Sequence, residues 1–335
     1  MTLFGTLPDG SEVHSSTISA HGMTISVMTL GASLIDLRLA GVDHPLVLGF
    51  PELVPYLTAH GRYFGAIVGR MANRIAHGRA GIDGRQYQFD RNEAGRNTLH
   101  GGSDGSGSRN WRRVDLGRGH ISFSDRLPEG HMGFPGALLV RASYRIQPGP
   151  RLEIEILASA LDTTLCNFAQ HSYFNLDGTG TVAQHRLSSP ATQYLPVDEW
   201  GIPLGAPAPV QGSHMDFRQP TLLAERLSGP VIDHNLCLHP RKSRELRPAA
   251  RLRSRRLTLD IASTEPGLQV YAGHHIRPGP SGLSGRPYQP HAGIALESQL
   301  WPDAPNHPQY PSALLPLGQI YRQTTSLSFG GNPDG

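Results

Sequence analysis

The chain has 335 residues, of which 38% are hydrophobic and 17% are charged, and this composition excludes a disordered or coiled-coil protein. Its 39 glycines and 28 prolines interrupt helices and mark turns, so we expect many short strands and few short helices. The formal net charge of +3 is too small an excess to indicate a nucleic-acid partner by itself.

Strands are predicted wherever apolar and polar residues alternate, because successive side chains of a strand point to opposite faces. In chain order, the alternating segments are Ile121–Phe123, Val140–Ile146, Leu152–Ile156, Leu257–Ile261 and Leu327–Phe329. Turn-forming pairs such as Asp9-Gly10, Asp83-Gly84 and Asp177-Gly178 separate the ordered segments. The pattern is typical of an all-β fold of mostly antiparallel strands with one solvated face.

Four other segments differ in character from these strands. Residues 101–108 and 277–290 are rich in turn-forming residues and are expected to form long loops. The stretch from Thr221 to Leu227 is expected to make two helical turns. The basic residues between Arg241 and Arg256 fit a nucleic-acid patch or a solvated strand face, and the lack of interleaved aromatic residues favours the strand.

Lys242 is the only lysine in the chain, and it lies in the run Arg241-Lys242-Ser243-Arg244. That context is typical of solvated surface, which argues against a buried Schiff-base lysine and against pyridoxal-phosphate chemistry. Cys166 and Cys237 are too few to form a disulfide scaffold.

The N-terminal residues Met1 to Gly5 show no basic segment followed by a long apolar run, so we expect no signal peptide. No apolar run approaches the length that crosses a bilayer, and we expect no membrane partner. No break in composition marks a domain boundary. We therefore expect one domain over residues 1–335, cytoplasmic, and either monomeric or homodimeric.

Common catalytic, nucleotide-binding and metal-binding motifs are either missing or lack the structural context that they need. Residues Gly101–Gly105 match G-x-S-x-G, but more glycine and serine follow where a nucleophile elbow needs a helix. Neither a G-x-G-x-x-G nor a P-loop motif occurs. The 17 histidines invite a metal hypothesis, but no H-E-x-x-H or C-x-x-C is present. His274 and His275 are adjacent on an expected strand and would point to opposite faces, so we expect no metal.

Four polar clusters interrupt the strand pattern. They are 69–75 with 97–102, 170–176, 233–235, and 293–299 with 302–306. Taken singly, their residues have ordinary explanations. Glu297 could be a surface carboxylate at a strand end, and His171 could be a core histidine. Arg74 and Asp233 could form an ion pair, while Asn73 and His100 could cap turns.

Taken together and in this order, the clusters resemble the aldose 1-epimerase (galactose mutarotase) family, from about Gly10 to Phe329. The matching motifs are Gly-Arg-x-Ala-Asn-Arg-Ile at Gly69–Ile75, Leu-His-Gly-Gly at Leu99–Gly102, His-x-Tyr-Phe-Asn-Leu at His171–Leu176, Asp-His-Asn at Asp233–Asn235, Glu-Pro-Gly-x-Gln-x-Tyr at Glu265–Tyr271, and Leu-Glu-x-Gln with Pro-Asp-Ala-Pro-Asn at Leu296–Gln299 and Pro302–Asn306. Departures from the family's usual pattern occur at Gln170, Ser298 and His275, and they leave substrate preference open.

The resemblance implies a single large β-sandwich, the galactose mutarotase-like supersandwich, with an open sugar cleft and neither a metal nor an organic cofactor. It also implies that Glu297 removes the proton of the anomeric hydroxyl while His171 protonates the ring oxygen, with His100 on the same side. The ring then opens, the aldehyde rotates about C1–C2, and the ring closes on the other face. The residues expected to bind the sugar are Asn73, Arg74, His100, His171, Ser172, Tyr173, Asp233, Gln269 and Glu297.

One acid and one base suffice for this chemistry, because each contributes about 10²–10⁴-fold and the spontaneous reaction already proceeds in water. The expected substrate is a free aldose such as galactose or glucose. Alternatives are an epimerase for a pentose, an epimerase for a hexose 6-phosphate, and a non-catalytic sugar-binding protein. The phosphosugar reading needs a spare arginine near C6, for which Arg218 or the Arg241 region are candidates. A glycoside hydrolase would need two paired carboxylates, and only Glu297 has a convincing context.

Overall fold

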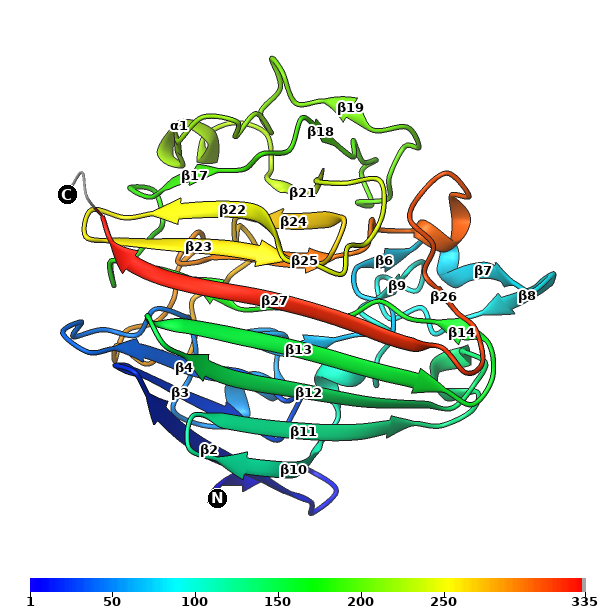
Figure 1. Cartoon of the computed structure of the whole chain (residues 1–335), viewed down its shortest axis with the longest axis horizontal. Coiled ribbons are helices and arrows are strands. Elements are labelled where there is room, and N and C mark those ends of the chain that lie inside the picture. The colour runs from blue at the N-terminus through cyan, green and yellow to red at the C-terminus, as the bar shows by residue number, and fades with distance from the viewer. Residues whose placement is uncertain (333–335) are drawn as a thin grey trace.

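The computed structural model describes residues 1–332, and it is built almost entirely from antiparallel strands (Figure 1). Its largest sheet has nine strands in the order β10-β11-β12-β13-β27-β23-β22-β17-β20. These strands are β10 (Arg112–Gly117), β11 (His120–Leu127), β12 (Leu138–Gln147), β13 (Arg151–Ala160), β27 (Ile320–Gly331), β23 (Leu257–Ser263), β22 (Arg247–Arg253), β17 (Arg186–Ser188) and β20 (Thr221–Leu222).

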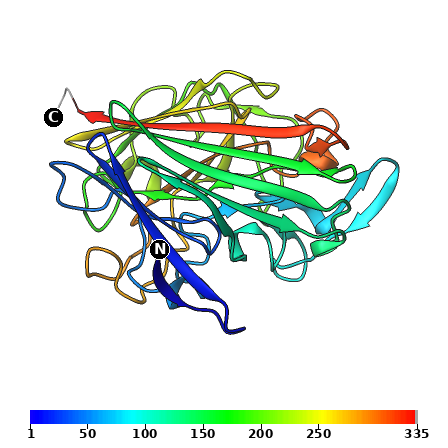
Figure 2. The same ribbon diagram turned by 60° about the horizontal axis from the view of Figure 1, so that its bottom comes forward.

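A six-stranded sheet packs against this large sheet, in the order β16-β25-β24-β21-β18-β19. Its strands are β16 (Tyr173–Phe174), β25 (Ile294–Gln299), β24 (Gly267–Tyr271), β21 (Asp233–Cys237), β18 (Gln193–Tyr194) and β19 (Ala208–Pro209). A four-stranded sheet follows chain order with β1 (Thr2–Thr6), β2 (Glu12–Ala20), β3 (Met23–Met28) and β4 (Leu34–Leu39). In Figure 2 this N-terminal sheet crosses one end of the nine-stranded sheet.

Short two-stranded sheets and single helical turns complete the fold. The pairs are β5 (Ile67–Val68) with β15 (Ala169–Gln170), β6 (Arg74–Ile75) with β9 (Thr98–Leu99), β7 (Arg79–Ile82) with β8 (Arg85–Gln88), and β14 (Thr164–Leu165) with β26 (Leu314–Leu315). The helical turns are α1 (Ala224–Leu227) and the 3₁₀ turns at Val54–Leu57, Ala76–Gly78, Ser106–Ser108, His131–Gly133 and Ala304–Asn306. None of the helices within residues 1–332 has the length and apolar character needed to cross a membrane.

The main core lies between the sheets. The inward residues Tyr144 and Ile154 of the large sheet share one buried cluster with Leu268, Val270 and Leu296 of the six-stranded sheet. Burying one such aliphatic side chain contributes about 1.5–3 kcal/mol, so this shared cluster holds the two sheets together. The predicted β-sandwich with few short helices is confirmed.

All five predicted strands are present, within β11, β12, β13, β23 and β27. The predicted helix from Thr221 to Leu227 is wrong in its first half. Thr221 and Leu222 form β20 and pair with Leu187 and Arg186, and the helix is a single turn from Ala224. Pairing to a sheet edge satisfies those backbone groups, so the local helical preference is overridden.

Two expectations about single residues also need correction. His274 and His275 lie in a turn after β24, not on a strand, and their ring centroids are 4.0 Å apart. Lys242 is not a freely solvated side chain. Its ammonium lies 2.8 Å from a carboxylate oxygen of the fully buried Glu265 and 3.7 Å from the ring centroid of Tyr321.

Candidate active site

A cleft of about 330 Å³ lies beside the six-stranded sheet, and it gathers residues from distant parts of the chain. Eight of the nine predicted site residues line it: Asn73, Arg74, His100, His171, Tyr173, Asp233, Gln269 and Glu297. Ser172 does not line the cleft. It is buried, and its hydroxyl accepts a 2.6 Å hydrogen bond from the side-chain amide of Gln170.

Strand register explains how the floor of the cleft forms. Gln269 of β24 pairs with Glu297 of β25 on one side and with Asn235 of β21 on the other. Directly paired residues project from the same face of a sheet, and so do residues two apart on one strand. Asp233 therefore joins Gln269 and Glu297 on the face that carries the cleft.

The opposite wall is a tight backbone arrangement that holds His100. Asn73 and His100 both have positive φ, at 64° and 51°, and they bracket the β6–β9 pair. The backbone N–H of Asn73 donates to Nδ1 of His100 over 3.2 Å, and the backbone N–H of His100 donates to the carbonyl of Asn73 over 3.0 Å. Because Nδ1 accepts a hydrogen bond from the backbone N–H of Asn73, the proton of neutral His100 is on Nε2.

His171 and Glu297 face each other at the centre of the cleft. Nε2 of His171 lies 3.5 Å from Oε1 of Glu297, at the outer limit of a hydrogen bond. Both side chains are almost fully buried, at 6% and 2% exposure. Oε2 of Glu297 and Nδ1 of His171 have no hydrogen-bond partner among the described residues. Oε2 of Glu297 and Nδ1 of His171 thus keep hydrogen-bonding capacity that no described residue fills.

Burial shifts both groups toward their neutral forms. It raises the pKa of Glu297 well above the ordinary value, Asp233 adds to this effect, and the Arg74 cation opposes it. Burial lowers the pKa of His171 to about 4. Both shifts favour a protonated Glu297 beside a neutral His171. That state holds the same number of protons as a carboxylate beside an imidazolium, so one proton belongs to the pair.

Arg74 is held between two carboxylates at the side of the cleft. Its Nε donates to both oxygens of Glu93 over 3.0 and 3.1 Å, and its Nη1 lies 3.7 Å from Oδ2 of Asp233. Burial alone would lower the pKa of Arg74, but Asp233 and Glu93 outweigh it and raise the pKa. Asp233 also accepts a 2.7 Å hydrogen bond from the side-chain amide of Gln269.

His100, His171 and Glu297 each offer a potential metal-ligand atom, and these atoms lie within 4.8 Å of one another. The tautomer of His100 does not fit three-fold ligation. Its Nδ1 already accepts the Asn73 N–H, and its Nε2 carries the proton that a metal would displace. The arrangement suits a hydrogen-bond donor toward a ligand better than it suits a metal ligand.

Sequence reasoning did not include several residues that line the cleft. Tyr63 lies tilted against the imidazole of His100 and stacks on that of His171, with ring centroids 4.7 and 6.0 Å away. Tyr271 and His275 form part of another wall, and Glu93 lies behind Arg74. Glu93 sits in the polar turn 90–97, which has no pattern that distinguishes it from a solvated loop. Tyr271 closes the predicted motif 265–271, so its position on the Gln269 face followed from period-2 alternation.

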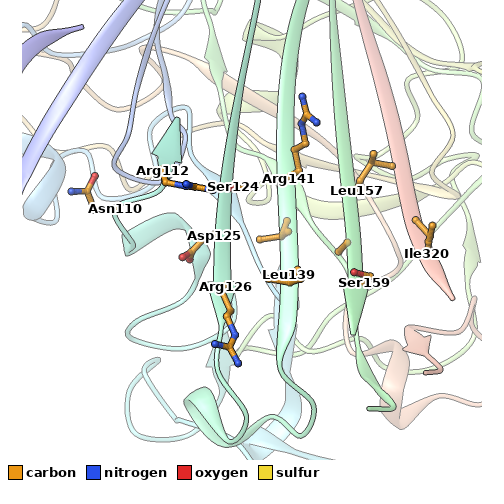
Figure 3. A pocket seen from close by; sticks show the side chains of 12 residues that line it. Asn110, Arg112, Ser124, Asp125, Arg126, Leu139, Arg141, Leu157, Ser159 and Ile320 are labelled. Atoms are coloured by element: carbon orange, nitrogen blue, oxygen red, sulfur yellow. The ribbon is translucent and has the colours of Figure 1, made fainter. Parts of the chain in front are cut away.

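A second cavity, of about 620 Å³, lies on the outer face of the nine-stranded sheet (Figure 3). Aliphatic side chains of Leu139, Leu157 and Ile320 line it together with several arginines. Its one carboxylate, Asp125, is paired with Arg109 over 2.5 Å. None of the predicted site residues lies there, and it lacks a facing acid and base.

The aldose 1-epimerase family model matches residues 14–328. The chain is 38% identical to a galactose mutarotase of Rattus norvegicus, with 98% of this chain and 97% of the relative covered. It is 34% identical to an aldose 1-epimerase of Escherichia coli, with 96% of each covered. Among solved structures, the GalM/aldose epimerase homologue of C. elegans superposes with a TM-score of 0.86 at 30% identity, covering 95% of this chain and 99% of the other. The galactose 1-epimerase of Lactobacillus acidophilus superposes with a TM-score of 0.84 at 25% identity, covering 98% of each.

Proposed function

Because this chain belongs to the aldose 1-epimerase family and acts as an aldose 1-epimerase, we propose that Glu297 and His171 are its base and acid. The reaction interconverts the α and β anomers of a free aldose. In the α→β direction Glu297 accepts the proton of the C1 hydroxyl, and His171 donates a proton to the ring oxygen. The C1–O5 bond breaks, the aldehyde rotates about C1–C2, and closure on the other face returns both protons.

The observation that carries this proposal is the 3.5 Å approach of His171 Nε2 to Glu297 Oε1 inside a buried cleft. The anomeric oxygen and the ring oxygen are bonded to the same carbon, so their base and acid must be close neighbours. General acid–base catalysis also needs each group within hydrogen-bond reach of the atom it serves.

The single proton of the pair makes ring opening and closure a balanced cycle. Ring opening moves one proton from C1–OH to Glu297 and another from His171 to the ring oxygen. The free aldehyde then faces a protonated carboxyl and a neutral imidazole, which is the proton arrangement that burial favours for this pair. Burial therefore stabilises the protonation states that the pair has beside the open-chain intermediate. Substrate binding must favour the opposite states, a Glu297 carboxylate and a protonated His171, before the ring opens.

His100 supports the same ring-oxygen side as a hydrogen-bond donor. Its pKa is held well below the ordinary value by burial, by His171 and by Arg74, so it stays neutral near pH 7. A neutral imidazole with its proton on Nε2 donates a hydrogen bond and holds no spare proton to release. We assign the acid to His171 because its Nε2 is the imidazole nitrogen that faces Oε1 of Glu297, at 3.5 Å, and we place His100 among the binding residues with Asn73, Arg74, Tyr173, Asp233 and Gln269.

The charges in the cleft favour a free sugar over a sugar phosphate. Three carboxylates line it, those of Glu93, Asp233 and Glu297, against one guanidinium, that of Arg74. Glu93 and Asp233 already neutralise that guanidinium. Of the two arginine sources considered from the sequence, Arg218 pairs with Asp216 and lines other surface cavities, and no residue of the Arg241 region lines the cleft. A phosphate dianion would therefore meet no uncommitted arginine among the residues that line the cleft.

Polarimetry of freshly dissolved α-D-galactose and α-D-glucose tests the proposal, with the spontaneous rate as the blank. We expect the wild-type chain to accelerate both, and Glu297→Gln to lose about 10²–10⁴-fold. Glu155→Gln is the matched control, because it makes the same chemical change on the large sheet, where Glu155 pairs with Arg322. A Glu297→Gln variant that folds and keeps half the wild-type rate would refute the base assignment. No wild-type acceleration of either sugar would refute the proposed substrates.

A further inference from the structure

We propose that Glu93 is a positioning residue for this site, which holds one edge of the Arg74 guanidinium so that the other edge faces Asp233 and the sugar. The inference rests on the proposed function, because it assigns Arg74 to the substrate. Glu93 makes no direct contact with the acid–base pair, so its effect is expected to pass through Arg74.

The Glu93 carboxylate contacts two nitrogens on one edge of the Arg74 guanidinium. The Glu93 carboxylate accepts from Arg74 Nε over 3.0 and 3.1 Å, and its Oε1 lies 2.9 Å from Nη2. Nη1 is the nitrogen left out of this contact, and it is the one that approaches Asp233, at 3.7 Å. Two-point pairing fixes the plane of a guanidinium as well as its position. Glu93 thus determines which nitrogen Arg74 presents to the cleft.

Hydrogen bonds with Asn97 hold Glu93 in place. The side-chain amide of Asn97, which is fully buried, donates to Oε2 of Glu93 over 3.3 Å. The backbones of the same two residues exchange hydrogen bonds of 3.1 and 3.2 Å, which closes the turn between them. The carboxylate therefore belongs to a rigid turn, unlike a surface glutamate that must be ordered to form an ion pair.

The backbone at Gly201 packs against the Arg74 guanidinium. A methyl group placed on Gly201, whose φ is +74°, would lie 2.7 Å from Nη1 and 2.8 Å from the central carbon of the guanidinium. Glu93 and Gly201 therefore confine Arg74 from two sides, and the cleft is the remaining direction. The side chain is 17% exposed, so little solvent is available to compensate for a lost partner.

A double-mutant cycle in mutarotation tests the proposal. We expect Glu93→Gln to lower kcat/KM for galactose by about 10- to 100-fold, as misplacement of a positioned group does, mainly through KM. Lysine cannot form the two-point pair, so in an Arg74→Lys background the same change should alter kcat/KM by less than about twofold. The control is Asp125→Asn, which removes one of the two carboxylate partners of Arg109 at residues that do not line the cleft, and it should leave both constants unchanged.

Three results would each overturn the proposal. These are unchanged kinetics in Glu93→Gln, an equal loss in the wild-type and Arg74→Lys backgrounds, or a kinetic loss that only accompanies unfolding. Galactose binding by calorimetry separates this proposal from the proposed function, because a Kd needs no turnover. The wild-type chain could bind galactose without accelerating mutarotation. In that case, a Kd that rises in Glu93→Gln only when Arg74 is present still supports the positioning role of Glu93. A Kd insensitive to Glu93 refutes it.

Discussion

Replacing Lys242 with methionine tests the contribution of its ion pair with Glu265, whose carboxylate is fully buried. Lys242 lies 2.8 Å from Oε1 of Glu265, which is 1% exposed, and neither oxygen of Glu265 accepts another hydrogen bond from the residues described. Burial raises the pKa of Glu265 and Lys242 lowers it. The variant therefore leaves a buried carboxyl without the cation that opposes the cost of its charge.

Loss of one partner from a buried pair typically costs about 3–5 kcal/mol. We take the lower end, about 3 kcal/mol, because Lys242 is partly solvated at 28% exposure. Methionine has an unbranched apolar side chain of similar length, but it also removes the ammonium that lies 3.7 Å from the Tyr321 ring centroid. Over 335 residues the unfolding entropy is about 2 cal/mol/K per residue, so 3 kcal/mol lowers Tm by about 4 °C.

The assay is urea unfolding at pH 7.5 and at pH 4.5, with Lys242→Met/Glu265→Gln as the rescue variant. In Lys242→Met the folded-state pKa of Glu265 is raised further above its unfolded value. Such a group contributes stability below the unfolded pKa and loses it as pH rises toward the folded pKa. The variant should therefore be most destabilised at pH 7.5, less so at pH 4.5, and largely rescued by Glu265→Gln. Equal losses at both pH values would refute the reasoning.

Three further outcomes follow from the cleft. The pH profile of kcat/KM should be bell-shaped, with an acid limb near the His171 pKa of about 4 and an alkaline limb above the ordinary range of a glutamate, because activity needs one proton on the pair. A profile that rises through pH 6–7 would contradict the shared proton. Gly201→Ala should raise KM by about 10-fold, because its methyl group would meet Arg74, and an unchanged KM would show that the loop yields. Ser172→Ala should keep kcat/KM within about twofold and lose about 1 kcal/mol of stability, and a large kinetic loss would place that hydroxyl in the chemistry.

The sequence predicted the long strands well because their burial repeats every second residue. Val140–Ile146 and Leu152–Ile156 alternate without error, and each side chain faces the core or the solvent as its polarity predicts. The segment 221–227 failed because its first residues gain ladder hydrogen bonds with β17, a tertiary contact that no local pattern encodes.

The candidate site was predicted by family motifs, and the strand register explains why residues from separate motifs lie together in the cleft. Gln269 and Glu297 lie in separate motifs, yet they are direct partners on adjacent strands. The partners of charged residues outside those motifs could not be predicted. The polar turn around Glu93 gives no sign that it faces Arg74, and the run around Lys242 resembles surface although its ammonium reaches a buried carboxylate.

The strand order has a consequence for the time course of folding. β13 completes its pairing only with β27 at the end of the chain, and β16 with β25 joins residues 173–174 to residues 294–295. Pairings so distant in sequence form slowly, because the loops between them must be closed first. The cleft needs residues from Asn73 to Glu297, so no early intermediate contains it. Recovery of mutarotation during refolding should therefore follow the slowest phase and never precede it.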